Sequence, residues 1–262
     1  MSAAEFFCSI ENFYVPQILA EEKNFLIVYK PPGMHSAPLA RSPGETLTIP
    51  EWCAAKFPEI RDLPGRQAGE GGLLHRLDFD THGLLLVART AAGMESLLAL
   101  QREGKIVKEY SALASESKTA LPGMPAQKPE FPAGVVLAAG IASHPFSINS
   151  AFRAYGPGRK SVRPLMAGSA ETETLYTTEV IGASTLPGNI CRIRVRITRG
   201  FRHQIRCHLA WAGMPILNDK LYGGASYGKG LLGLRACSLI FTDPSSGIER
   251  LYSIPVPEPG DI

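Results

Sequence analysis

Continuous apolar runs, broken by polar and glycine-rich stretches, predict the main elements of this chain. Phe25-Leu26-Ile27-Val28 and the run from Leu84 to Val87 have strand length and no polar residue, which is typical of strands buried on both faces. Lys30-Pro31-Pro32-Gly33 ends the first run, because this sequence favours a turn. Residues 17–29 are therefore predicted to form two short strands around a turn at residues 21–24.

Two segments have the signals of short helices. Thr48 followed by Pro50 predicts a helix that runs to Lys56, since proline is favoured in the first helical turn. Thr90 predicts the start of a second helix, whose apolar side chains repeat at helical spacing until Gly104 ends it. Further segments with strand composition are 106–113, 151–155, 172–181, 190–198, 234–242 and 250–254.

The order of these elements indicates the fold class and the domain organisation. Few helices and many strands, without regular alternation of the two, predict an α+β fold with a mainly antiparallel or mixed sheet core and flanking helices. We expect residues 1–16 to form a loosely attached arm and residues 17–262 to form one domain. Within it, residues 115–170 hold many Pro, Ala, Gly and Ser residues without a period, which predicts a loop-rich variable region.

Composition narrows the class of protein. The hydrophobic content of 45% is ample for a packed core. No apolar run approaches the ~18 residues of a membrane span, and Glu5 stands where a signal peptide needs basic residues, so we expect a cytoplasmic protein without membrane association. The cysteines form no CxxC pair, which predicts reduced thiols rather than disulfides or a zinc knuckle. A monomer without a protein partner is the expected state.

Positive charge is concentrated in one segment, although the net charge of the chain is only +3. Residues 192–208 are rich in arginine, include two histidines and contain no acidic residue. The alternation from Arg192 to Ile197 predicts a strand with one arginine face and one apolar face. An arginine face binds anions in some proteins and is merely solvated in others, so both interpretations stay open.

The residues after this strand predict a helix with a placed arginine. In the segment 202–209, Arg202 and Arg206 are expected on one helical face, and Ile205 and Leu209 on another. Apolar packing would then hold Arg206, whose planar guanidinium suits a bidentate bond with a carboxylate or a phosphate. The alternative is an ordinary surface arginine.

Asp78 occupies a tight polar turn between a glycine-rich approach and the apolar run that starts at Leu84. An aspartate in this position is either a reactive group that faces a cleft or the centre of an Asx-type turn. The same choice applies to Asp80, two residues further on. Turn chemistry alone favours the second interpretation.

Lys108-Glu109-Tyr110 lies on a predicted strand. Lys108 and Tyr110 are expected on one side of this strand, and Glu109 on the other. Tyr110 is either a core tyrosine or an aromatic platform that stacks on a base and takes part in proton transfer.

Histidine and glycine patterns give no support for a metal or a nucleotide cofactor. His203 and His208 do not have the i, i+4 spacing that places two ligands on one helical face, and no HExxH pattern occurs. Residues 156–160, Gly-Pro-Gly-Arg-Lys, have neither the Walker nor the Rossmann spacing. We therefore expect neither a metal nor an external cofactor.

Three segments occur in an order that is found in one enzyme family. They are His75-Arg76-Leu77-Asp78 with Thr81 and Gly83-Leu84-Leu85-Leu86, then Lys108-Glu109-Tyr110, then Arg202 to Leu209 running into Gly213-Met214-Pro215-Ile216, Asp219 and Leu221-Tyr222-Gly223. With these segments the chain resembles the RluA-type pseudouridine synthases, over about residues 17–257. Lys30-Pro31-Pro32-Gly33 is similar to the opening turn of that family, whereas His82 and the turn at residues 198–202 depart from its usual pattern.

The resemblance implies that uridine in RNA is isomerised to pseudouridine. The N-glycosidic bond breaks, the uracil turns, and its C5 atom joins the ribose. Asp78 is implied as the catalytic carboxylate, either as a nucleophile at C1′ or as a base at C2′. Arg206 would pair with Asp78 and keep it ionised, and Tyr110 would lie against the target base and help to move its C5 proton.

The resemblance also implies a set of RNA-binding residues around a central RNA-binding cleft. Arg76 would fill the gap left by the flipped nucleotide, and Leu77 and Ile205 would be apolar walls. The other residues implied at the RNA surface are His75, Thr81, Lys108, Arg202, His203 and Gln204. The expected substrate is rRNA or tRNA, and we expect the catalytic domain without the small basic S4 domain of many relatives.

Two other functions compete with catalysis on RNA. A non-catalytic RNA-binding or RNA-folding factor would use the same basic groove, but the intact set of Asp78, Tyr110 and Arg206 favours an enzyme. A retaining glycoside hydrolase would need two carboxyl groups on opposite sides of a sugar, about 5 Å apart. Asp78 and Asp80 are expected to point the same way on an extended segment, so Asp80 is predicted to stabilise the turn instead.

Overall fold

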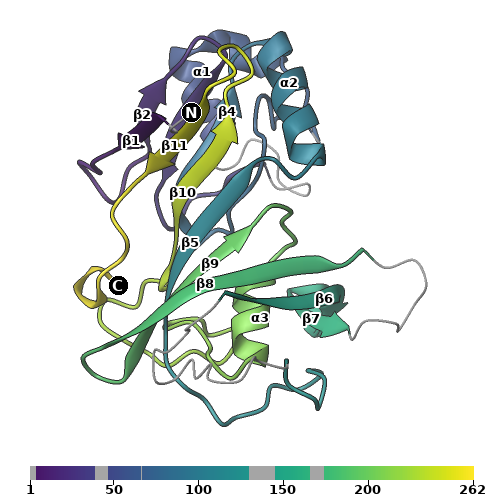
Figure 1. Ribbon diagram of the computed structural model, residues 1–262, viewed down its shortest axis with the longest axis vertical. Coiled ribbons are helices and arrows are strands. Elements are labelled where there is room, and N and C mark those ends of the chain that lie inside the picture. The colour runs from purple at the N-terminus through teal and green to yellow at the C-terminus, as the bar shows by residue number, and fades with distance from the viewer. Residues whose placement is uncertain (1–3, 39–46, 66, 130–144, 166–173) are drawn as a thin grey trace. The chain divides into compact units, whose positions relative to one another are not determined.

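The computed structural model describes residues 4–38, 47–65, 67–129, 145–165 and 174–262 (Figure 1). The chain divides into two compact units. One contains residues 1–108 and 236–256, and the other contains residues 109–235 and 257–262. The first unit is therefore assembled from two widely separated parts of the chain.

The sheet of the first unit has the strand order β1-β11-β10-β4-β3-β2. These strands are β1 (Ala4–Phe7), β2 (Gln17–Glu21), β3 (Phe25–Lys30), β4 (His82–Ala88), β10 (Leu234–Thr242, most of which lies in this unit) and β11 (Glu249–Ser253). β3 and β4 pair antiparallel, from Phe25 opposite Ala88 to Lys30 opposite Gly83, and every residue of both strands is buried. The two apolar runs thus form neighbouring interior strands, as predicted.

Gly83 is required where β4 passes β10. Its φ of 124° lies in the region that favours glycine, and a Cβ atom there would collide with the backbone of Ala236. Beside these strands, the rings of Phe25, Phe241 and Tyr252 pack against one another in the core.

Residues 1–16 were expected to form a loosely attached arm, and this expectation is wrong for residues 4–7, which form β1. β1 pairs in parallel with β11 over its whole length, and the ring of Phe6 stacks on Tyr252 with centroids 4.9 Å apart. A strand near the other end of the chain holds this segment. Such a contact leaves no local pattern in the sequence.

Both predicted helices of the first unit are confirmed. α1 spans Ile49–Lys56 and begins after Thr48, whose backbone N–H donates to a glutamate in the first turn at 2.9 Å. α2 spans Ala91–Arg102, and the hydroxyl of Thr90 accepts from the N–H of Gly93 at 3.0 Å. Within the described part of the chain, the helices are too short or too polar to cross a membrane. Short 3₁₀ turns lie at Pro58–Asp62, Pro157–Arg159 and Pro259–Asp261.

The sheet of the second unit has the strand order β5-β9-β8-β6-β7. These strands are β5 (Val107–Ala114, most of which lies in this unit), β6 (Phe146–Tyr155), β7 (Ser161–Leu165), β8 (Tyr176–Leu186) and β9 (Ile190–Ile197). β6 pairs antiparallel with both β7 and β8, and β8 pairs antiparallel with β9. A single helix of this unit in the described residues, α3 (Gln204–Trp211), packs against β7 and β8. The predicted α+β class with a mixed, mainly antiparallel sheet is confirmed.

The predicted loop-rich region 115–170 is wrong in part, because β6 and β7 form a hairpin within it. Buried and exposed residues alternate over the first half of β6. β7 is the last strand in the strand order and is therefore an edge strand. It includes Pro164, and an edge strand tolerates the missing N–H of a proline. Residues 151–155 of β6 were predicted as a strand, whereas short polar side chains hide the first half of β6, and this proline hides β7, from a compositional prediction. Residues 130–144 and 166–170 of the predicted region lie outside the described residues.

Candidate active site

Asp78 lies in the turn that leads into β4, in the first unit. Its backbone carbonyl accepts from the N–H of Thr81 at 3.1 Å, which closes the predicted turn through the backbone. Asp78 is half-buried, and Asp80 is exposed. A backbone hydrogen bond thus closes the turn, and Asp78 lies on it partly open to solvent.

The segment after β3 holds the backbone on both sides of Asp78. The hydroxyl of Ser36 accepts from the N–H of Leu77 at 2.9 Å and donates to the Leu77 carbonyl at 2.8 Å. On the other side, the carbonyl of Phe79 accepts from the N–H of Gly33 and from the ammonium of Lys30, each at 3.0 Å. We call residues 30–36 the Asp78 clamp.

Lys30 is a buried cation beside the candidate carboxylate. Its ammonium donates to the carbonyls of Pro31 at 2.8 Å, Met34 at 2.7 Å and Phe79 at 3.0 Å, which matches the three N–H donors of the protonated group. Burial lowers the pKa of Lys30 from 10.5 to about 7, and the nearby carboxylates of Asp78 and Asp80 oppose this shift. The sequence resemblance placed Lys30 in a turn motif but assigned it no role at the site.

The RNA-binding residues predicted near Asp78 differ in exposure. The side chain of Arg76 is 52% exposed, and its Nη1 lies 3.4 Å from a carboxylate oxygen of the buried Glu70. His75, Leu77 and Thr81 are buried, and the Nε2 atom of His75 accepts from a backbone N–H of β4 at 3.2 Å. In this structure these three residues support the turn, while Arg76 reaches the surface.

Tyr110 lies on β5, where the predicted alternation is confirmed. Lys108 and Tyr110 are both buried, and Glu109 between them is partly exposed. The Glu109 carboxylate accepts from the Nε and Nη2 atoms of Arg196 at 3.0 and 2.7 Å. This pairing holds Glu109 on the side of the strand opposite to Lys108 and Tyr110.

Arg206 is buried on α3 and makes a bidentate ion pair with Asp219. The Nε and Nη2 atoms of Arg206 lie 2.7 and 2.8 Å from the two carboxylate oxygens. The same carboxylate accepts from the backbone N–H groups of Leu221 and Tyr222, and the guanidinium lies 5.4 Å from the Tyr222 ring centroid. Asp219 was part of the matched motif, but the sequence did not identify it as the partner of Arg206. The pairing of Arg206 with Asp78 stays a prediction.

The start of α3 corrects the predicted helix over residues 202–209. His203 has a left-handed backbone with φ of 56°, so the helix begins at Gln204, and Arg202 does not share a helical face with Arg206. Arg202 is exposed, and its Nη2 donates to the carbonyl of Arg159 at 2.7 Å. A local turn before the helix, in which the Gln204 side chain accepts from the N–H of Phe201, overrides the helical spacing.

Protein contacts hold the first residues of α3, Gln204 and Ile205, and the preceding residue His203. The amide of Gln204 accepts from a backbone N–H of the preceding turn at 2.9 Å and donates to the carbonyl of Thr177 at 2.9 Å. The Nδ1 atom of His203 lies 3.2 Å from the hydroxyl of Tyr222, and Ile205 is buried. Their predicted contacts with RNA stay predictions.

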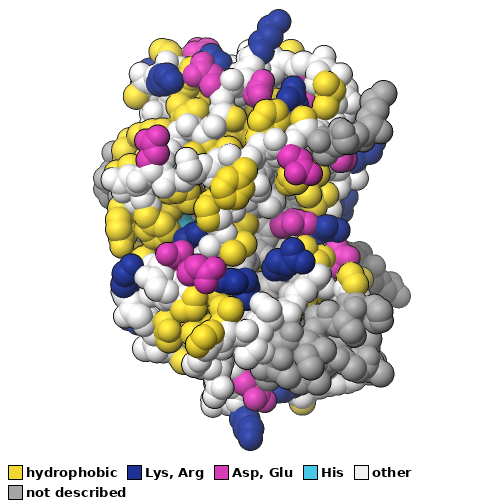
Figure 2. Space-filling view, turned by 60° about the vertical axis from the view of Figure 1, so that its left-hand side comes forward, with side chains coloured by type: hydrophobic (Ala, Val, Ile, Leu, Met, Phe, Trp, Pro, Cys, Tyr) yellow, Lys and Arg dark blue, Asp and Glu magenta, His cyan; other side chains and the backbone are white. Residues whose placement is uncertain are grey.

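Two arginines on the arginine face of β9, Arg192 and Arg196, form ion pairs with acidic side chains of the protein. Arg196 also lies near Glu179, with 3.7 Å between the closest atoms, and Arg192 pairs with Glu258 at 2.7 Å. Figure 2 shows acidic and basic side chains interspersed over the face that it presents. Ion pairs within the protein thus engage these two arginines, and contacts of this strand with phosphates stay a prediction.

His208 is a buried neutral group. Its Nε2 lies 2.9 Å from the Ser150 hydroxyl and its Nδ1 lies 2.8 Å from the Thr178 hydroxyl. Burial lowers the pKa of His208 from 6.5 to about 3. Over the residues that the structure describes, His, Cys, Asp and Glu side chains form no group suited to hold a metal ion.

The candidate residues therefore fall into two groups. Asp78 with Arg76 and the Asp78 clamp belongs to the first unit, and Tyr110 with Arg206 and Asp219 belongs to the second. Each group is held by hydrogen bonds and ion pairs within its own unit. The meeting of both groups at one substrate is part of the proposed function.

Solved structures of two human proteins share this fold. Human RNA Pseudouridylate Synthase Domain Containing 1 aligns with a TM-score of 0.60 and 20% identity, over 95% of this chain and 86% of that chain. Human RNA Pseudouridylate Synthase Domain Containing 4 aligns with a TM-score of 0.58 and 19% identity, over 93% of this chain and 89% of that chain. The fold is that of the pseudouridylate synthases.

The sequence relatives identify the family. The family model of RNA pseudouridylate synthases matches residues 24–211, and the chain belongs to this family. Ribosomal large subunit pseudouridine synthase D of Yersinia pestis is 30% identical over 207 residues, which are 79% of this chain and 52% of that protein. The protein of the same name from Escherichia coli K12 is 27% identical over 255 residues, which are 92% of this chain and 67% of that protein. The chain spans about half the length of the Yersinia relative.

Proposed function

We propose that this protein is an RNA pseudouridine synthase that isomerises uridine to pseudouridine in structured RNA. The observation that supports this most directly is the placement of Asp78: a half-buried carboxylate on a turn whose backbone is held from both sides, within the segment that matches the family. A carboxylate held in this way loses little freedom when it meets a ribose.

The reaction conserves all atoms of the substrate. The bond between N1 of uracil and C1′ of the ribose breaks, and a bond between C5 and C1′ forms. The proton at C5 leaves, and N1 gains a proton. No net oxidation or hydrolysis occurs, so the proposed reaction needs no external cofactor.

Asp78 acts at the ribose in this proposal. As a nucleophile, its carboxylate would attack C1′ and displace the uracil. As a base, it would remove the proton at C2′ so that a glycal forms. Both routes need an ionised carboxylate, and a nearby cation favours that form. Lys30 supplies one such cation from the first unit.

Tyr110 and Arg206 complete the proposed site from the second unit. Tyr110 would lie against the target base and help to move the C5 proton. Arg206, oriented by Asp219, would provide a further counter-charge for Asp78. Arg76 would occupy the gap left by the flipped nucleotide, which is consistent with its partly exposed guanidinium.

The proposed partner is RNA, and rRNA is favoured by the names of the relatives, which are ribosomal large subunit enzymes. We place tRNA second among the substrates. The proposed setting is the cytoplasm, and the proposed state is a monomer without a protein partner or membrane association.

Mapping pseudouridines in total RNA from a deletion strain tests this proposal. The wild-type protein should restore at least one site, and Asp78→Asn should restore none while it folds normally. Asp80→Asn makes the same change in charge at an exposed carboxylate and should behave as wild type. An undiminished signal with Asp78→Asn would overturn catalysis by Asp78. Rescue of growth without any pseudouridine would favour an RNA-folding factor.

A further inference from the structure

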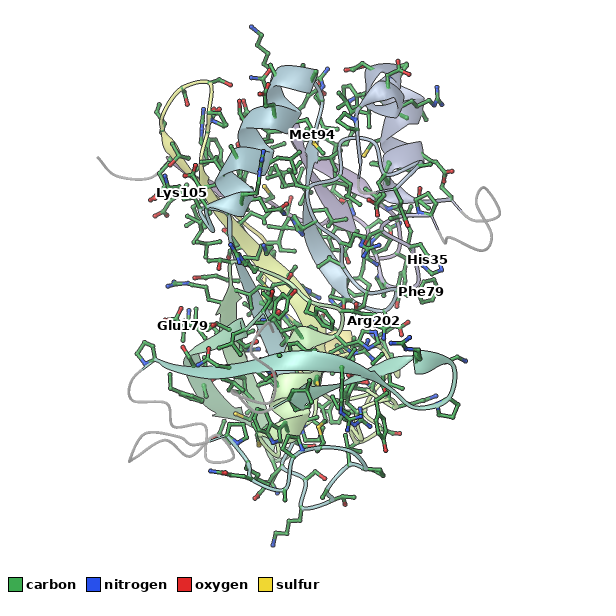
Figure 3. The ribbon with its side chains drawn as sticks, turned by 90° about the vertical axis from the view of Figure 1, so that its right-hand side faces the viewer. His35, Phe79, Met94, Lys105, Glu179 and Arg202 are labelled. Atoms are coloured by element: carbon green, nitrogen blue, oxygen red, sulfur yellow. The ribbon has the colours of Figure 1, made fainter. Side chains whose placement is uncertain are left out.

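Phe79 presents an aromatic ring to solvent directly beside Asp78. Its side chain is 45% exposed, and the ring of His35 lies against it with centroids 4.6 Å apart and an interplanar angle of 46° (Figure 3). His35 belongs to the Asp78 clamp, and Phe79 belongs to the turn that the clamp holds. Two segments thus bring two rings together at the surface of the first unit.

The position of Phe79 is fixed by its backbone rather than by burial of its ring. Its carbonyl accepts from Lys30 and from Gly33, so the main chain is anchored while the ring stays accessible. The exposed part of the ring forgoes a corresponding part of the ~2 kcal/mol that complete burial would contribute. An anchored, exposed ring is suited to stacking on a ligand, because little conformational freedom is lost on binding.

We propose that Phe79, backed by His35, stacks on an unpaired base next to the target uridine. This inference rests on the proposed function and narrows its substrate to uridines in loops or bulges with an unpaired neighbour. Phe79 directly follows Asp78 in the same turn, so a base that stacks on its ring would belong to a nucleotide close to the target uridine.

The surroundings of the ring favour a base over other ligands. Asp80 is exposed next to Phe79, and its negative charge disfavours a phosphate at this point. Among the described residues, an exposed phenyl ring with a histidine ring beside it matches one flat, polar-edged base.

Binding of labelled single-stranded oligoadenylate tests the platform without any catalysis. Stacking of a base on an aromatic side chain contributes about 1–3 kcal/mol, so Phe79→Ala should weaken binding roughly 5- to 150-fold. Phe79→Tyr should retain affinity. Phe79→Leu, which is apolar but has no ring, should lose it like alanine. Phe7→Ala removes an aromatic ring that is 72% exposed on β1 and should change nothing.

A double-mutant cycle on the mapped RNA target then locates the stacked base. Removing the base beside the target uridine should raise the KM of the wild-type protein by the factor seen for Phe79→Ala, and should add little to that variant. Independent, multiplicative effects would overturn the platform, as would equal affinities of the leucine and tyrosine variants. If the wild-type protein forms no pseudouridine, the proposed function fails, and the oligoadenylate series alone decides on the platform.

Discussion

The hydroxyl of Ser36 satisfies both backbone groups of Leu77, accepting from its N–H at 2.9 Å and donating to its carbonyl at 2.8 Å. One side chain thereby replaces the partner that a neighbouring strand would supply. Leu77 directly precedes Asp78. The buried Ser36 hydroxyl therefore fixes the position of the backbone from which the Asp78 side chain projects.

Ser36→Ala should reduce both stability and catalysis. Two buried backbone groups would lose their partner, which costs about 1–3 kcal/mol for each group left unsatisfied. The looser turn should lower kcat about tenfold or more with a smaller change in KM, since a misplaced catalytic group affects the chemical step. Denaturant unfolding and steady-state kinetics on the mapped RNA measure these two effects. Ser147→Ala, at an exposed serine, is the matched control, and an unchanged kcat in Ser36→Ala would contradict the positioning role.

Lys30 should make stability depend on pH in the alkaline range. Its pKa is about 7 in the folded protein and 10.5 as the ordinary value, so the unfolded chain binds more protons between these limits. The free energy of unfolding should therefore rise with pH from 7 to 10.5, by at most about 1.4 kcal/mol per pH unit from this group.

Comparison of wild type with Lys30→Met isolates this contribution. The difference in free energy of unfolding between the two proteins should move in favour of wild type as the pH rises from 7 to 10. Lys23→Met, at an exposed lysine, should give a profile parallel to wild type. Parallel profiles for wild type and Lys30→Met would show that Lys30 titrates normally.

Asp219→Asn should destabilise the second unit strongly. The change leaves the buried guanidinium of Arg206 without its bidentate partner, and breaking such a pair typically costs about 3–5 kcal/mol. Glu258→Gln removes the partner of Arg192 at a side chain that is 61% exposed, and a surface pair of this kind contributes about 0–1 kcal/mol. Denaturant unfolding of both variants should separate them clearly. Equal losses would contradict the buried role of Asp219.

His208 should make the protein sensitive to acid. Its pKa falls from 6.5 to about 3 on folding, so the stability from the neutral side chain is fully present above pH 6.5 and is lost as the pH falls toward 3. His208→Gln should flatten this part of the stability profile. In NMR spectra of the wild type, the His208 ring should keep the signals of the neutral form at pH 5. Titration of that ring near pH 6.5 would contradict the prediction.

Local patterns predicted the elements that are decided locally. β3 and β4 were recognisable because strands buried on both faces contain apolar residues throughout, and α1 and α2 because threonine caps precede them. β1 was missed because its partner strand lies near the opposite end of the chain. The first half of β6 and the whole of β7 were missed because their composition resembles that of a loop, whereas residues 151–155 of β6 had been predicted as a strand.

The candidate site was predictable in its central residues and not in their supports. Asp78, Tyr110 and Arg206 follow from ordered motifs that resemble one family. Their partners are set by tertiary contacts: Ser36 reaches Leu77 across 41 positions of sequence, and Asp219 reaches Arg206 from a loop. No spacing rule connects such positions. The same limit explains Arg202, which a helical pattern placed on α3 and the fold places before it.

The two-part make-up of the first unit constrains the order in which the protein folds. β4, which follows Asp78, is flanked on one side by β10, and β10 is synthesised only after residues 109–233, which make up most of the second unit. Until then the edge of β4 that later pairs with β10 has no native partner, and a long loop must close before the sheet is complete. Nascent chains that are truncated before residue 236 should therefore expose an unpaired, aggregation-prone strand edge. We expect chaperones that shield such edges to act during this interval.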